Sequence, residues 1–156
     1  MNGLMTSDAL LEHWQGHRRL TRRTLEAFPE AELFSYLPAP PLRSFAEMMR
    51  EALEIEPVLR GVATGEWRWE TRYEHVKTKE AYLAAWDESN ETLLRYWQDV
   101  STKKLLELEA DHFFGGPPKT NLARVLYLID NEIHHRAQGY VYLRLLGRTP
   151  PAFYER

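Results

Sequence analysis

The sequence predicts an all-α protein, a four-helix bundle with one short extra helix. Four segments place apolar residues three and four positions apart, the repeat of a helix with one buried face. Connectors rich in proline and glycine separate these segments, and no stretch shows the convincing alternation of a half-buried strand. The 156 residues suffice for a full hydrophobic core, so we expect a single helical-bundle domain over residues 1–156.

Composition excludes several classes of protein. The chain has no cysteine, which excludes disulfides, thiol catalysis by the protein and zinc–thiolate sites. Its formal net charge of −3 argues against nucleic-acid binding through a strong basic field. No run approaches the ~20 apolar residues of a membrane span, and the N-terminus lacks a signal peptide's apolar core. We therefore expect a cytoplasmic protein that binds neither nucleic acid nor membrane.

The first helix is predicted over residues 7–28, because capping side chains precede the apolar pattern and Pro29 ends it. Basic residues cluster within 17–23, and we expect them on a solvated face. His13 and His17 are spaced i, i+4 and could chelate a metal from one helix face. Surface histidines are the favoured interpretation, since the neighbouring arginines oppose a bound cation.

The second helix is predicted from Ser44 to Val62. Ser44 and Glu47 form a capping-box pattern at its start, and Pro57 should kink or irregularise its middle. Glu51 lies near the boundary of the buried stripe, a place that periodicity alone leaves undecided.

The remaining elements follow from the same signals. Residues 34–42 contain three prolines and predict an extended connection, and a loop with large aromatic side chains spans 61–69. A third helix is predicted from Thr78 to Val100 with an aromatic core stripe, followed by a short helix over 103–109.

The last long helix is predicted over residues 120–147, where Gly147 suits the C-terminal cap and two prolines follow. Its middle carries a dense polar cluster at 130–138, which is costly in a core-facing helix unless its groups are paired or bound. Steps of three and seven from Leu128 place Asn131 and His135 on the inner face. The residues placed nearer the flank are Asp130, His134 and Arg136.

Spacing alone leaves two interpretations of this pair. An inward histidine is more often a satisfied core residue than a metal ligand, and asparagine is a weak neutral ligand. The alternative is an i, i+4 grip on one metal ion.

Several motifs together resemble the DinB/YfiT-like superfamily. The resemblance is carried by residues 132–138 (Glu-Ile-His-His-Arg-Ala-Gln), by 142–147 and by Pro150-Pro151. Shorter matches occur at 36–38, at Arg43-Ser44 and in the loop from Gly61 to Trp67. The resemblance implies a four-helix bundle that forms a homodimer and holds a divalent metal (Zn, Ni, Fe or Mn) with three histidines. Members include transferases and isomerases that use low-molecular-weight thiols such as bacillithiol or mycothiol.

The chain departs from the family pattern at its ligands. Glu51 and Asn131 stand where the family has two of its histidines, and only His135 matches. Either the metal is lost and Glu51 pairs with His135 through Asn131, or the three hold a metal with oxygen-rich ligands. The first is favoured, because this set binds late transition metals more weakly than three imidazoles do.

Two functions follow. In the first, an altered metal site supports a thiol-dependent transferase or hydrolase-type reaction, with His135 as ligand or base and Glu51 as ligand or carboxylate partner. In the alternative, the chain is a non-catalytic, stress-associated or ligand-binding dimer that has lost the metal. It would bind a small thiol or apolar ligand with the aromatic loop 67–69, Trp86 and Tyr140.

Overall fold

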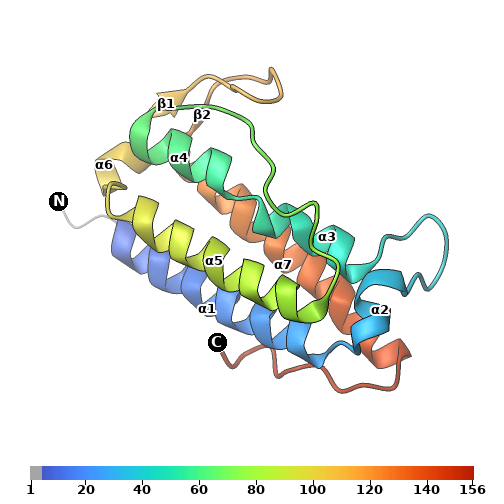
Figure 1. Cartoon of the computed structure of the whole chain (residues 1–156). Coiled ribbons are helices and arrows are strands. Elements are labelled where there is room, and N and C mark those ends of the chain that lie inside the picture. Colours follow the sequence, from blue (N-terminus) through green and yellow to red (C-terminus); the bar gives the residue numbers. More distant parts are fainter. Residues whose placement is uncertain (1–4) are drawn as a thin grey trace.

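The computed structural model describes residues 5–156 and is an all-α bundle, as predicted (Figure 1). Three long helices, α1, α5 and α7, and the successive pair α3 and α4 lie alongside one another. The helices are α1 (Ser7–Ala27), α2 (Glu30–Ser35), α3 (Phe45–Leu53), α4 (Glu56–Thr64), α5 (Lys79–Trp97), α6 (Thr102–Leu105) and α7 (Asn121–Leu145). Two short antiparallel strands, β1 (Leu108–Glu109) and β2 (Lys119–Thr120), precede α7.

The two predicted terminal helices have the expected caps. The Thr6 hydroxyl accepts a hydrogen bond from the Ala9 N–H at the start of α1, and Thr120 does the same for Ala123 at the start of α7. After α7, Gly147 adopts a left-handed conformation with φ of 71°. The predicted boundaries of both helices are correct to within two residues.

The predicted second helix is two helices. α3 ends at Leu53 and α4 starts at Glu56, with Pro57 in its first turn, where proline's missing N–H costs no helical hydrogen bond. The expected irregularity at Pro57 is therefore confirmed, but the continuous helix from Ser44 to Val62 is wrong. The Glu54 carboxylate at the break accepts backbone N–H groups from the loop after α4, at 2.7–3.1 Å.

Other short elements differ from the prediction. α2 occupies residues that include the start of the expected extended connection, and the predicted helix over 103–109 is only Thr102–Leu105, followed by β1. The α2 segment has six residues and each strand has two. Elements this short complete too little of a 3.6- or 2-residue period to give a reliable signal.

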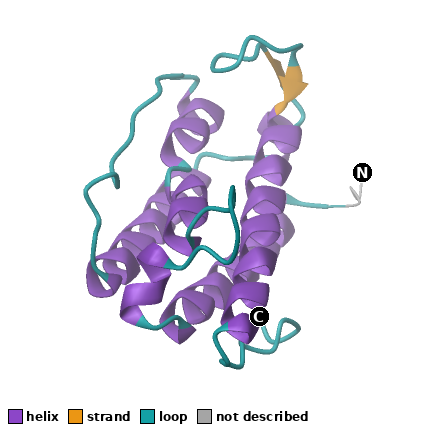
Figure 2. Ribbon diagram, turned by 90° about the vertical axis from the view of Figure 1, so that its right-hand side faces the viewer, coloured by secondary structure: helices purple, strands orange, loops and turns teal. Residues whose placement is uncertain are grey.

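Buried side chains form two hydrophobic clusters along the bundle. Close approach of α3 to α7 depends on Gly139, since a Cβ atom there would lie 2.3 Å from the Phe45 ring. Beyond α7 the chain reverses and runs back along the outside of the bundle, and Arg156 packs at Gly16 of α1 (Figures 1 and 2). Within residues 5–156, no helix has the length and apolar character needed to cross a membrane.

Candidate functional site

The three predicted site residues meet between α3 and α7. His135 Nε2 lies 2.9 Å from Glu51 Oε2, and the Asn131 side-chain amide donates to the same oxygen at 3.2 Å. Arg43, just before α3, donates from its guanidinium to the other oxygen, Oε1, at 2.6 Å. Each oxygen of the carboxylate thus has a donor from the chain itself. We call Arg43, Glu51, Asn131 and His135 the outer cluster.

Local structure sets these positions. The capping box at Ser44 and Glu47 is formed, so α3 starts where predicted and presents Glu51 two turns later. The Tyr142 hydroxyl on α7 donates to the Arg43 carbonyl oxygen at 3.0 Å, which ties the residue before the cap to the same helix as His135. The contact of Tyr142 with Arg43 therefore keeps the start of α3, and with it Glu51, next to His135 on α7.

Glu51 is an anion in this cluster. Partial burial by itself raises the pKa of the Glu51 carboxyl, but hydrogen bonds from Arg43, His135 and Asn131 outweigh it and lower the pKa to about 2. The side chain remains 42% exposed, so solvent screens these interactions. A carboxylate with this pKa is a poor proton acceptor at neutral pH.

His135 faces Glu51 with one nitrogen and the protein interior with the other. The residue is 5% exposed, and its Nδ1 atom is buried without a hydrogen-bond partner among the described residues. Since Glu51 is an acceptor, we assign the proton to Nε2. One ring nitrogen is thus occupied by Glu51, and the other is buried.

The prediction that Asp130, His134 and Arg136 lie on the flank of the last helix is correct only in part. Asp130 and His134 are exposed, as expected for the flank, and His134 lies 3.0 Å from the Gln138 amide nitrogen. Arg136 is only 6% exposed, so its placement on the flank is wrong. It belongs to a second polar group that the sequence interpretation missed.

This second group, the inner network, joins α7 to α1 around Glu132, which is 1% exposed. The Glu132 carboxylate accepts from the Thr21 hydroxyl at 2.6 Å and from the Trp14 indole at 3.2 Å. Arg136 donates to the Thr21 hydroxyl at 2.8 Å and to the His17 ring at 2.9 Å. The inner network consists of Trp14, His17, Arg18, Thr21, Glu132 and Arg136.

Arg18 of α1 is the second buried guanidinium group of the inner network. Its guanidinium donates to the Ala52 carbonyl oxygen at 2.7 Å and to the Ser89 hydroxyl at 3.0 Å, and it lies 3.6 Å from the centre of the Trp86 ring. It is 3.7 Å from the Glu132 carboxylate. The prediction that the basic run of α1 is a solvated face is wrong for Arg18, which is 1% exposed.

His17 is buried as well, so its assignment as a surface histidine is wrong, whereas His13 is exposed as expected. Burial lowers the pKa of His17 to about 4, with a further contribution from the positive charges of Arg136, Arg156 and His13. Periodicity could have found Arg18, because Trp14, Arg18, Thr21 and Leu25 follow one another in steps of four, three and four. His17 likewise stands three residues after Trp14 and four before Thr21.

The aromatic residues proposed for ligand binding lie in separate surroundings. Trp67 stacks on His112 with ring centres 4.7 Å apart, and its neighbour Trp69 packs edge-on against Phe113. Trp86 is buried beneath Arg18. Tyr140 borders a cleft beside the C-terminal tail.

The outer cluster does not fit a tightly held divalent metal. It offers one imidazole, one carboxylate and one amide, and a guanidinium already occupies the carboxylate oxygen that faces away from His135. That fixed positive charge at 2.6 Å opposes a second cation on the same carboxylate. Among residues 5–156, no three His, Cys, Asp or Glu side chains gather in a geometry that could hold a metal ion.

Comparison with known proteins identifies the family. The sequence matches the DinB family over residues 1–156. A DinB-like protein from Bacillus cereus ATCC 10987 has the same fold, with a TM-score of 0.78 and 23% identity over 96% of this chain and 98% of that one. The DinB-like protein YjoA from Bacillus subtilis gives 0.75 and 21% identity over 94% and 97% of the two chains. No curated protein matches the chain. The chain belongs to the DinB family.

Proposed function

We propose that this chain is a metal-independent DinB-family protein that acts by binding rather than by catalysis. The observation that carries the proposal is that both oxygens of Glu51 already receive donors from the chain itself, from Arg43, Asn131 and His135. Glu51, Asn131 and His135 stand at the positions where the resemblance to the family implies a metal and three histidines. The cluster then serves to fasten α3 to α7.

The state of His135 supports the same proposal. A histidine that acts as a general base on an outside substrate needs one nitrogen within hydrogen-bond reach of that substrate. Here Nε2 is hydrogen-bonded to Glu51, and Nδ1 is buried with no partner within residues 5–156. The ring is therefore arranged as a structural residue.

Metal binding by untagged protein tests the proposal against the altered-metal-site alternative. We expect the purified wild type to contain metal far below one equivalent, and calorimetric titration with Zn²⁺, Ni²⁺ or Mn²⁺ to give no saturable binding at this site. One equivalent of bound metal that is lost in His135→Ala, but kept in the control His134→Ala, would overturn it. His134 is a suitable control because it is exposed and adjacent in sequence.

A gain-of-function variant makes the negative result informative. The double variant Glu51→His, Asn131→His restores three imidazoles around the point where Glu51 Oε2 now meets His135. We expect it to bind Zn²⁺ or Ni²⁺ at least ~100-fold more tightly than the wild type, since imidazole suits both ions. Equal, weak affinity in both proteins would contradict the assigned correspondence of ligand positions.

A further inference from the structure

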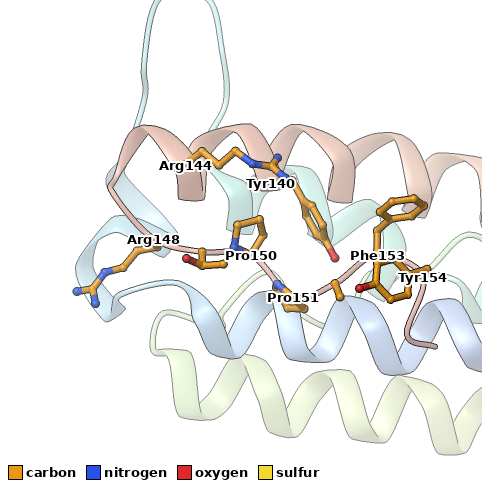
Figure 3. A pocket seen from close by; sticks show the side chains of 9 residues that line it. Tyr140, Arg144, Arg148, Pro150, Pro151, Phe153 and Tyr154 are labelled. Atoms are coloured by element: carbon orange, nitrogen blue, oxygen red, sulfur yellow. The ribbon is translucent and has the colours of Figure 1, made fainter.

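A cleft lies between the C-terminal half of α7 and the tail that follows it (Figure 3). Its volume is about 500 Å³, within the range of small-molecule sites. Arginine, tyrosine, phenylalanine, proline, threonine and alanine line it, and none of its lining residues is acidic. The cleft is separate from the outer cluster, none of whose four residues borders it.

Tyr140 supplies an unused polar group at this cleft. The residue is 9% exposed, and its hydroxyl group is buried without a hydrogen-bond partner among the described residues. Figure 3 shows the side chain directed from α7 toward the tail at Pro151 and Phe153. A buried hydroxyl without a partner costs free energy, which an acceptor atom from a ligand would recover.

Positively charged side chains lie at the cleft and near it. The Arg144 guanidinium lies 5.8 Å from the centre of the Tyr140 ring and borders the cleft. One turn before Tyr140, Arg136 belongs to the inner network, which holds two buried guanidinium groups against the single carboxylate of Glu132. Arg156 adds a further positive charge near His17. An anionic group is the ligand chemistry that these charges favour.

The tail contributes an apolar surface and is held at its ends. Phe153 and Tyr154 are 65% and 72% exposed, with ring centres 5.7 Å apart. The Arg148 N–H donates to the Leu143 carbonyl oxygen at 2.8 Å, and Arg23 donates to the carbonyl oxygen of Glu155. No hydrogen bond among the described residues ties 149–154 to a helix, so this stretch can lift enough to admit a ligand to the Tyr140 hydroxyl.

We propose that this cleft binds a small aromatic carboxylate, with the carboxylate beside Arg144 and the aromatic body against the tail. The Tyr140 hydroxyl donates to a ligand oxygen, and the rings of Phe153 and Tyr154 cover the apolar part. The proposal rests on the binding role proposed above and gives it a site and a ligand class.

Titration of ¹⁵N-labelled full-length protein with 2-naphthoate tests the proposal. We expect the amide signals of residues 140–154 to shift in a saturable way, and the neutral analogue 2-naphthamide to bind about tenfold more weakly, the loss of one charge-assisted contact. Arg144→Gln should weaken naphthoate binding by about the same factor and leave naphthamide unchanged. Tyr140→Phe should lower the affinity for both ligands by about threefold to tenfold, because it removes one neutral hydrogen bond.

Arg148→Gln is the matched control. Arg148 also borders the cleft, but its side chain extends away from the other labelled residues in Figure 3. Its replacement should leave naphthoate affinity unchanged. Any of three results would overturn the proposal. These are equal affinity for the two analogues, an equal loss of affinity in both arginine variants, and no shift of the signals of residues 140–154 at about 10 mM ligand, a concentration tenfold above a Kd of ~1 mM.

The two proposals fail separately. If 2-naphthoate shifts no signal within residues 140–154 and no metal binds at Glu51, only the proposed ligand site is overturned. Metal bound through His135 overturns the proposed function, whatever the cleft binds.

Discussion

The two polar groups on α7 differ in depth, although they alternate along the same turns of the helix. Asn131 and His135 belong to the outer cluster with α3, whereas Glu132 and Arg136 belong to the inner network with α1. Glu51 in the outer cluster has a side chain that is 42% exposed, and Glu132 is 1% exposed. The Coulomb attraction of an ion pair is strong only where water is excluded, so the same chemistry should have different energetic weight in the two places.

The inner network and the outer cluster also differ in what the loss of one member would do. The inner network satisfies a buried carboxylate with a hydroxyl, an indole and two nearby guanidinium groups. Removing one member leaves other buried charges without partners. In the outer cluster, Glu51 and Arg43 are partly exposed, so solvent can replace a lost partner of the Glu51 carboxylate, and we expect substitution of Glu51 to cost less.

The largest expected effect is at Glu132. Glu132→Gln leaves two buried guanidinium groups without an anion, and we expect the free energy of unfolding to fall by about 3–5 kcal/mol. Urea denaturation at pH 7 measures this change, with Glu12→Gln as a surface control, since Glu12 pairs with Arg19 at an exposed site. A loss below about 1 kcal/mol, the range of surface pairs, would remove the proposed contrast between the two groups.

A pH effect of intermediate size should come from His17. Its pKa is about 4 in the folded protein against 6.5 usually, so below pH 6.5 the unfolded chain binds a proton that the folded protein does not. Stability should therefore decrease as pH falls from 6.5 to 4 and change no further, through this residue, below pH 4. His17→Gln removes the titrating group and should reduce this decrease by about 3 kcal/mol, the value of a shift of about 2.5 pKa units.

The control for His17 is His13→Gln, an exposed neighbour on the same helix. It should retain the wild-type slope of unfolding free energy against pH. If His17→Gln keeps that slope as well, the inner network tolerates a protonated imidazole and its charge balance differs from the one described.

The smallest effect is expected at Glu51. Glu51→Gln should lower the free energy of unfolding at pH 7 by less than about 1 kcal/mol, because the pair is screened by solvent. The pKa of Glu51 is lowered from 4.5 to about 2, so this contribution is present above pH 4.5 and is lost as pH falls toward 2. Wild type and variant should thus converge in acid.

Denaturation of both proteins between pH 2 and 7 measures this convergence. A Glu51→Gln loss as large as that of Glu132→Gln would show that the outer cluster is as essential to the fold as the inner network. The expected low cost of substitutions in the outer cluster would then be wrong.

Much of the fold could be predicted from local patterns. Capping residues and breakers located α1, α5 and α7 closely, because their signals lie within a few residues of the helix ends. Helical spacing also placed His135 inside, and the family pattern directed attention to Glu51 and Asn131. The break between α3 and α4 was foreseen only as an irregularity, since Pro57 is compatible with either a kink or a new first turn.

The sequence by itself determined the helical bundle, the caps, and the presence of Glu51 and Asn131 at positions where the resemblance to the family implies histidines. Only the tertiary structure decided which charged residues are buried. Arg18, His17 and Arg136 look like surface residues by type. In the fold, Glu132 pairs with Arg18 and Arg136, and His17 contacts Arg136, a residue more than 100 positions away along the chain. The structure also brought Arg43 to Glu51, because the energy of a charged group depends on partners that only folding supplies.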